Sequence, residues 1–237
     1  MSDLGLGMYT LTEASKLLGG VEVRSLNRWL YGYSHGASRV AGVPRHSEPL
    51  WRPQYDPTAF GDKVIGFQDL LEVRIVREFV RAGLPLLVVR KCLERARQVF
   101  GAQYPLSTQR FVTDGETILH EARQAANEEE DGKLLDLRTM QYKFKAIIKP
   151  SLYAGIEYLG LQARRWYPEG ARVPIVVDPA VNFGHPIVRG TGIPTEALYA
   201  TFLAEGKDRA RVARLYEVSA QQVTAAVKFE SRLRNAA

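Results

Sequence analysis

The chain has 237 residues, of which 46% are hydrophobic and 24% are charged, and its formal net charge is +6. This composition is ordinary for a globular protein, with room for one large domain or for two to three small ones. The sequence contains no run of about 18 apolar residues and no basic segment followed by an apolar stretch at its start. We therefore expect no membrane span, no signal peptide and a cytoplasmic location.

Residues that could support catalysis or metal binding are scattered. The single cysteine, Cys92, cannot form an internal disulfide and has no neighbouring zinc ligands. No Gly-x-Ser-x-Gly elbow supplies a nucleophile, and no two histidines have metal-ligand spacing. The histidines are His35, His46, His120 and His185. We expect a protein that is not an enzyme, with no catalytic residue, no metal site and no cofactor.

Residues 9 to 31 predict two short helices around a glycine turn. Thr10 and Glu13 have the spacing of a capping box, and Gly19 and Gly20 follow the first helix. The second helix, from Val23 to Leu30, has one apolar face. Its other face carries Arg24, Ser25, Asn27 and Arg28. This is the spacing of a helix-turn-helix, and arginine and asparagine can form paired hydrogen bonds with base edges in the major groove. The alternative is a simple helix pair with a solvated arginine face.

Positive charge continues beyond this helix pair. Residues 24 to 55 hold five arginines against Glu48 alone. Three of them, Arg39, Arg45 and Arg52, fall in a segment rich in Gly and Pro that predicts a wing, with residues 50–52 and 54–55 as short strand pieces. We expect these three arginines to contact phosphates, which fixes the register of a protein on DNA without reading its sequence.

Two long amphipathic helices are predicted after the wing. Apolar residues recur at helical spacing from Phe67 to Val80, and Gly83 ends that helix. A second helix follows Pro85 and runs to about Phe100. We expect these two helices to form the contact between subunits of a homodimer.

The order of these elements resembles a MerR-type winged helix-turn-helix. The matching segments are Tyr9–Ala14, Ser25–Trp29, Ile65–Leu70 and Gly83–Leu86. The resemblance covers about residues 8 to 100 and departs from the family at residues 33 to 61, where the wing is longer than usual. It implies DNA binding through the second helix.

The middle of the chain predicts a small hairpin and helix unit. Residues 109–113 and 116–119 flank Asp114–Gly115, a dipeptide that tolerates a tight turn, and so predict a two-stranded ribbon. Residues 139–153 predict a helix. Residues 155–158 and 162–167 predict a second short hairpin about Gly160.

The C-terminal part predicts a strand at Ile175–Val177 and then three helices. Thr195 is the expected N-cap of the first helix, which ends near Gly206, and residues 208–216 and 219–233 form the other two. The loop from Gly184 to Gly192 is not a phosphate-binding loop, because Ile193 and Pro194 stand where Lys and Ser or Thr are needed.

This segment resembles the small helix-turn-helix domain of VapB-type antitoxins. The shared elements are Asp178–Pro179, Gly184-x-Pro186, Arg189–Gly190–Thr191 and Pro194–Thr195. The resemblance implies an antitoxin that neutralises a PIN-like ribonuclease toxin and represses its own operon on double-stranded operator DNA. His185 and Arg189 are candidate toxin contacts, because a basic group can occupy an acidic metal-binding centre. The alternative is that Arg189 pairs with Asp178 or a helix end and that His185 is a loop residue.

Together these patterns predict a mainly helical α+β protein with small β elements. Its expected domains are a winged helix-turn-helix (residues 1–104), a hairpin and helix unit (105–172) and a three-helix domain (173–237). The other function that the sequence leaves open is a MerR-like transcriptional regulator that responds to a small-molecule effector.

Overall fold

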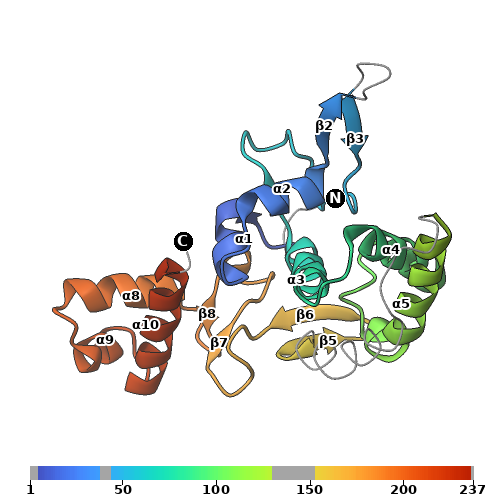
Figure 1. Ribbon diagram of the computed structural model, residues 1–237. Coiled ribbons are helices and arrows are strands. Elements are labelled where there is room, and N and C mark those ends of the chain that lie inside the picture. The colour runs from blue at the N-terminus through green and yellow to red at the C-terminus, as the bar shows by residue number, and fades with distance from the viewer. Residues whose placement is uncertain (1–4, 38–43, 130–152, 236–237) are drawn as a thin grey trace.

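The computed structural model describes residues 5–37, 44–129 and 153–235 (Figure 1). Helices dominate these residues, and the strands are short and paired only in twos. The prediction of a mainly helical protein with small β elements is confirmed. The helix predicted at residues 139–153 falls almost wholly outside the described residues.

The N-terminal module begins with the predicted helix pair. The Thr10 hydroxyl accepts a hydrogen bond from Glu13 N at 3.2 Å, and a Glu13 carboxylate oxygen accepts one from Thr10 N at 2.8 Å, so the capping box is confirmed. Residues 9 and 10 also pair in antiparallel register with residues 65 and 64. The elements of this module are β1 (Tyr9–Thr10), α1 (Leu11–Leu17), α2 (Val23–Tyr31), β2 (Tyr33–Ala37), β3 (Pro44–Ser47), β4 (Val64–Ile65), α3 (Phe67–Arg81) and α4 (Leu86–Phe100).

The strands of the predicted wing differ from expectation. The hairpin consists of β2 and β3, which project from the body beyond α2 (Figure 1), whereas residues 50–55 form no strand. The reason is burial. Leu50, Trp51 and Tyr55 are at most 5% exposed, and Trp51 Nε1 donates a hydrogen bond to the buried Asp69 carboxylate at 2.8 Å. This apolar segment fills the core, which is incompatible with an exposed ribbon.

Helices α3 and α4 use their apolar faces within the chain. Helix α3 packs inward with residues Phe67, Leu70, Leu71, Val73, Ile75, Val76 and Phe79, each at most 1% exposed. Helix α4 buries Val89, Cys92 and Leu93 and packs against α5. Cys92 is therefore a core residue. The apolar faces that we assigned to a dimer contact are already covered by the chain itself, because the residues of the middle unit pack onto them.

The ribbon predicted about Asp114–Gly115 is wrong. Residues Gln109–Glu129 form one long helix, α5, which packs along α4 (Figure 1). An Asp-Gly pair tolerates a left-handed turn but does not require one, and Gly115 keeps a helical backbone. A side chain there would approach the Phe111 ring to 2.7 Å, so the glycine makes room for a wholly buried aromatic ring. The second predicted hairpin is confirmed as β5 (Ile156–Leu159) and β6 (Gln162–Trp166), paired in antiparallel register.

The C-terminal module contains the three predicted helices. The Asp208 carboxylate caps α9 by accepting hydrogen bonds from Ala210 N and Arg211 N, and the Ser219 hydroxyl caps α10 by accepting one from Gln222 N. Thr195 is not the N-cap of α8. Pro194 takes that position, because the Thr195 hydroxyl is buried against the Pro186 carbonyl and the Glu230 carboxyl. The elements are β7 (Ile175–Val176), the 3-10 turn η2 (Asn182–Gly184), β8 (Ile187–Val188), α8 (Thr195–Ala204), α9 (Arg209–Leu215) and α10 (Ala220–Asn235).

Two contacts dock the C-terminal module on the rest of the chain. The Tyr9 hydroxyl of β1 donates a buried hydrogen bond to the Gly184 carbonyl at 2.8 Å, and Met8 N donates to the Phe183 carbonyl at 2.8 Å. On the other side, Trp166 and Val177 exchange backbone hydrogen bonds and so extend the β5–β6 hairpin. The residues after β7 and those of η2 thus contact the β5–β6 hairpin and the start of the chain.

Candidate nucleic-acid interface

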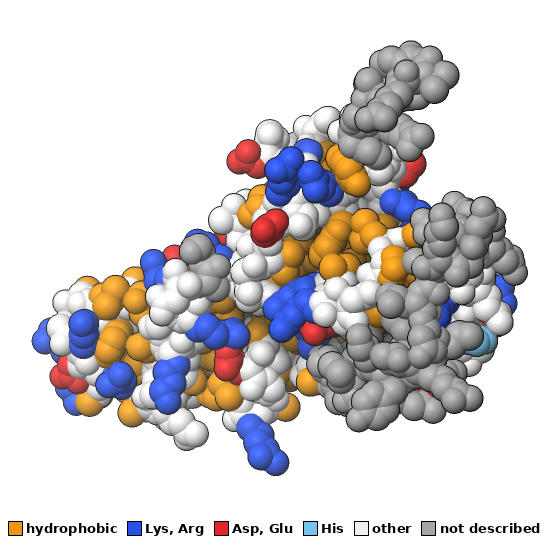
Figure 2. Space-filling model, viewed as in Figure 1, with side chains coloured by type: hydrophobic (Ala, Val, Ile, Leu, Met, Phe, Trp, Pro, Cys, Tyr) orange, Lys and Arg blue, Asp and Glu red, His pale blue; other side chains and the backbone are white. Residues whose placement is uncertain are grey.

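The outer face of α2 is the surface that the sequence assigned to base contacts. Leu26, Trp29 and Leu30 are at most 9% exposed, and burying them turns the opposite face of the helix to solvent. On that face Arg24 and Arg28 are exposed, and Ser25 and Asn27 are half-exposed. The structure therefore brings these four residues together on one surface, over which Figure 2 shows Lys and Arg side chains gathered.

Gly32 joins α2 to the projecting hairpin. Its backbone has a φ of +71°, and a side chain there would come within 2.5 Å of the Ser47 carbonyl oxygen. Only glycine adopts this conformation and this close approach without strain. The sharp exit places the first residue of β2, Tyr33, beside the helix, where its ring lies 4.9 Å from the Arg28 guanidinium carbon. Arg28 is thereby positioned by a cation–π contact from the wing.

One further cation lies on this surface, and the sequence reasoning missed it. Lys63 Nζ donates a hydrogen bond to Asn27 Oδ1 at 2.8 Å and lies 4.5 Å from the centre of the Tyr31 ring. Lys63 is far from α2 along the chain and belongs to no local pattern. The only signal for it was its place immediately before the apolar pair Val64–Ile65, which forms β4 and pairs with β1.

The three predicted phosphate contacts do not share one location. Arg39 lies outside the described residues. Arg45 belongs to β3, where it pairs with His35 of β2 in the wing. Arg52 is exposed in the loop after the wing, and its backbone carbonyl accepts a hydrogen bond from the Gln103 side chain at 3.2 Å, which places this loop against the end of α4.

The loop that contains Arg52 also holds an acidic residue, Asp56. Hydrogen bonds from Thr58 lower the pKa of Asp56, and the positive charge of Arg52 adds to that effect. Asp56 accepts from the Thr58 hydroxyl at 2.6 Å and from Thr58 N at 2.8 Å. The carboxylate is therefore held in a local turn, and Arg52 lies close enough to feel its charge.

The two candidate toxin contacts have different neighbours. His185 is half-buried, and its ring centre lies 6.2 Å from that of Tyr9. Arg189 is exposed and donates a hydrogen bond to the Ala171 carbonyl at 3.0 Å, with its guanidinium carbon 5.9 Å from the centre of the Tyr167 ring. The structure places one residue against the N-terminal module and the other beside the loop before β7.

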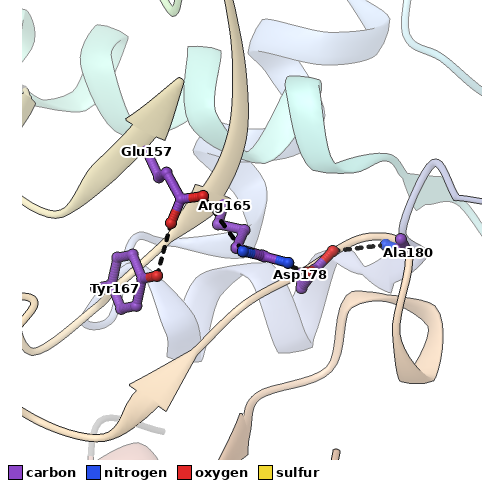
Figure 3. A network of polar contacts seen from close by, with 5 residues as sticks. All are labelled: Glu157, Arg165, Tyr167, Asp178 and Ala180. Atoms are coloured by element: carbon purple, nitrogen blue, oxygen red, sulfur yellow. Dashed lines mark hydrogen bonds and ion pairs between the residues drawn. The ribbon is translucent and has the colours of Figure 1, made fainter. Parts of the chain in front are cut away.

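Asp178, the alternative partner of Arg189, pairs with a different arginine. Arg165 Nε of β6 lies 2.5 Å from an oxygen of the buried Asp178 carboxylate, and its Nη1 lies 3.2 Å from Glu157 (Figure 3). The hydrogen bond to Asp178 raises the pKa of Arg165. Glu157 also accepts a hydrogen bond from the Tyr167 hydroxyl at 2.7 Å. Asp178 thus fastens the start of the C-terminal module to the β5–β6 hairpin.

Neither a metal centre nor a bilayer span is present in the described ranges. Within them no three His, Cys, Asp or Glu side chains are grouped as metal ligands require. No described helix has the length and apolar character needed to cross a bilayer.

Comparisons with known proteins agree with the antitoxin resemblance. Residues 175–229 match a family model described as "Protein of unknown function (DUF433)". The chain is 26% identical over 193 residues to a Mycobacterium tuberculosis protein named "Putative antitoxin VapB45", and the match covers 78% of each chain. The crystal structure of Rv2018 from Mycobacterium tuberculosis has a similar fold, with a TM-score of 0.64 at 21% identity over 94% of this chain and 98% of that one.

Proposed function

We propose that this protein is an antitoxin that neutralises a PIN-like ribonuclease toxin and, as a homodimer, represses its own operon by binding operator DNA. The similarity to a protein named as an antitoxin supports the first part. The observation that carries the second part is the surface of α2, where Arg24, Asn27 and Arg28 lie together beside a projecting hairpin.

In this proposal α2 enters the major groove, and its side chains contact base edges. The hairpin supplies Arg45, and the neighbouring segments supply Arg39 and Arg52, as contacts to the phosphate backbone. Dimerisation places two copies of α2 on the two halves of a pseudo-palindromic operator. Since α3 and α4 bury their apolar faces inside the chain, the dimer contact uses other surfaces.

Toxin binding is assigned to the C-terminal module. Arg189 is exposed and carries the charge that an acidic nuclease centre would attract. His185 lies at the boundary with the N-terminal module, so a toxin that reaches both residues would touch the surface between β8 and β1. The protein itself acts in the cytoplasm without catalysis and without a cofactor.

The first test is co-expression with the neighbouring gene. We would tag only this chain, purify it and ask whether a small ribonuclease is recovered with it and stays inactive until the two are separated. We expect recovery of an inactive nuclease, and reduced recovery with Arg189→Glu. Arg214→Glu, which reverses a charge at an exposed position of α9, is the matched control. Absence of any nuclease from the purified sample contradicts the antitoxin proposal.

DNA binding is tested on the protein's own promoter. We expect the double variant Arg24→Ala with Arg28→Ala to lose about tenfold or more in affinity, because each good base contact is worth about 1–3 kcal/mol. The control variant, Arg209→Ala with Arg214→Ala, removes the same charge from α9. Equal losses for both pairs, measured by fluorescence anisotropy, would mean that only net charge matters.

One observation favours a second function, a transcriptional regulator with a small-molecule effector. Four side-chain polar atoms are buried without a hydrogen-bond partner in the described part of the chain: Glu72 Oε2, Asn127 Oδ1 and the hydroxyls of Tyr153 and Tyr158. Buried polar groups are nearly always paired, so in this alternative a bound effector supplies their missing hydrogen-bond partners. Tight promoter binding with no nuclease recovered on co-expression, and with affinity changed by small molecules from cell extract, supports this alternative.

A further inference from the structure

We infer that Lys63 sets the base preference of the recognition helix, by turning the carbonyl oxygen of Asn27 toward its own ammonium group so that the side chain presents its amide N–H groups to DNA. This inference rests on the proposed binding of α2 in the major groove. It assigns a specificity role to a residue outside the helix-turn-helix itself.

Lys63 is held in place by the fold. It directly precedes β4, whose residues Val64 and Ile65 are buried and pair with β1. Its ammonium group lies between two partners, the Asn27 oxygen at 2.8 Å and the Tyr31 ring at 4.5 Å. Tyr31 is anchored in turn, because its hydroxyl donates a hydrogen bond to the Val64 carbonyl at 3.2 Å. The helix and the residues before β4 therefore form one local unit.

The orientation of Asn27 follows from donor and acceptor chemistry. A lysine ammonium can only donate, so the side-chain atom of Asn27 that faces Lys63 is the oxygen and not the nitrogen. A free asparagine reads adenine by accepting from N6 and donating to N7. The carbonyl oxygen has two lone pairs, and Lys63 takes one of them and turns the oxygen edge of the amide toward itself. The edge presented to DNA is then the N–H edge, whose donors suit the acceptors O6 and N7 of guanine or O4 of thymine.

The other charged side chains on this face of the helix are also hydrogen-bond donors. Arg24 and Arg28 are exposed and can only donate, and an arginine pairs with guanine O6 and N7. The Ser25 hydroxyl can act either way. The carboxylate at the start of the helix, Glu22, is exposed and is the acceptor on this side. The helix as a whole therefore favours acceptor-rich edges, and guanine above all.

The test is a selection from a random duplex DNA library with the full-length protein, followed by sequencing. The position read by Asn27 is identified as the one whose preference is lost in Asn27→Ala. We expect the unaltered protein to favour guanine or thymine there over adenine by about fivefold, a value suited to one hydrogen bond in place of two. In Lys63→Met the released Asn27 should reverse that preference toward adenine.

Two control variants separate the hydrogen bond from the charge. Lys63→Arg keeps a donor next to Asn27 and should keep the original preference, and Lys16→Met removes one positive charge from α1 and should leave it unchanged. If Lys63→Met weakens binding to all sequences equally, or if the unaltered protein already prefers adenine, the inference is wrong and Lys63 acts only on phosphate. If no sequence is enriched at all, the DNA-binding proposal fails, and this inference fails with it.

Discussion

At the scale of single residues, the most unusual group is the buried carboxyl of Glu72. This side chain is 0% exposed, and one of its oxygens accepts a hydrogen bond from Ser107 N at 2.8 Å. Burial raises the pKa of Glu72 to about 8, and the hydrogen bonds from Ser107 together with the charge of Arg97 offset only part of that rise. The folded protein therefore holds this proton at a pH where the unfolded chain has released it.

The expected result is a loss of stability with rising pH. Between a pKa of 4.5 for the unfolded chain and about 8 for the folded protein, the folded state binds more protons, so the free energy of unfolding falls as pH rises. The slope due to this group reaches at most about 1.4 kcal/mol per pH unit. Glu72→Gln, which cannot ionise, should be less sensitive to pH and more stable than the unaltered protein at about pH 9.

Urea unfolding at several pH values between about 5 and 9 measures this difference. Asp69, whose pKa burial raises to about 6, is present in both proteins, so only its coupling to Glu72, whose pKa the Asp69 charge raises further, remains in the comparison. Glu22→Gln, a change at an exposed carboxyl, is the matched control and should follow the unaltered protein. Parallel curves for Glu72→Gln and the unaltered protein would show that Glu72 does not titrate in this range.

At the scale of elements, α5 depends on one glycine inside a helix. Glycine normally costs a helix about 1 kcal/mol relative to alanine, so Gly115→Ala should stabilise α5 if space allowed. Here a Cβ atom would come within 2.7 Å of the buried Phe111 ring, which cannot move without disturbing the core. Overpacking of this kind costs about 1–3 kcal/mol and outweighs the gain in helix propensity.

We therefore expect Gly115→Ala to lower the free energy of unfolding by about 1 kcal/mol or more. The neighbouring change Asp114→Ala, at an exposed position, is the control and should be neutral or slightly stabilising. Thermal unfolding followed by circular dichroism measures both. If Gly115→Ala is instead more stable than the unaltered protein, the Phe111 ring can adopt another conformation without disturbing the core.

At the scale of the whole molecule, the C-terminal module is tied to the first strand of the chain. Tyr9 is 0% exposed, and its hydroxyl donates to the Gly184 carbonyl across 175 residues of sequence. Burial raises the pKa of Tyr9 well above its usual value, so the hydroxyl remains a donor. The winged module and the C-terminal helices should therefore unfold together.

The expected result is one unfolding transition, with the same midpoint by tryptophan fluorescence and by circular dichroism. Tyr9→Phe leaves the Gly184 carbonyl unpaired and should cost about 1–3 kcal/mol while keeping the two signals coincident. Tyr199→Phe, on a half-exposed part of α8, is the control. Two separated transitions in the unaltered protein would contradict this coupling and would favour independent domains.

Most of the helices can be located from the amino-acid sequence, because the signals that define them are local. Capping pairs and apolar periodicity act over three or four residues, and they correctly located the helix pair at residues 9–31 and the three C-terminal helices. The same local signals put Arg24, Ser25, Asn27 and Arg28 on one face of α2. The turn predicted at Asp114–Gly115 is wrong for the same reason. A local turn signal contains no information about the buried Phe111 ring, which lies beside Gly115 in the folded protein.

Pairing between groups that are distant in sequence depends on how the chain folds. Lys63 forms a hydrogen bond with Asn27, which lies 36 residues away in the sequence. The Asp178 carboxylate, a predicted alternative partner of Arg189, forms an ion pair with Arg165 instead. Residues 50–55 form no part of the wing hairpin, because Leu50, Trp51 and Tyr55 are buried in the core. Pairing and burial depend on distances that arise only when the chain has folded, so no spacing rule in the sequence could have supplied them.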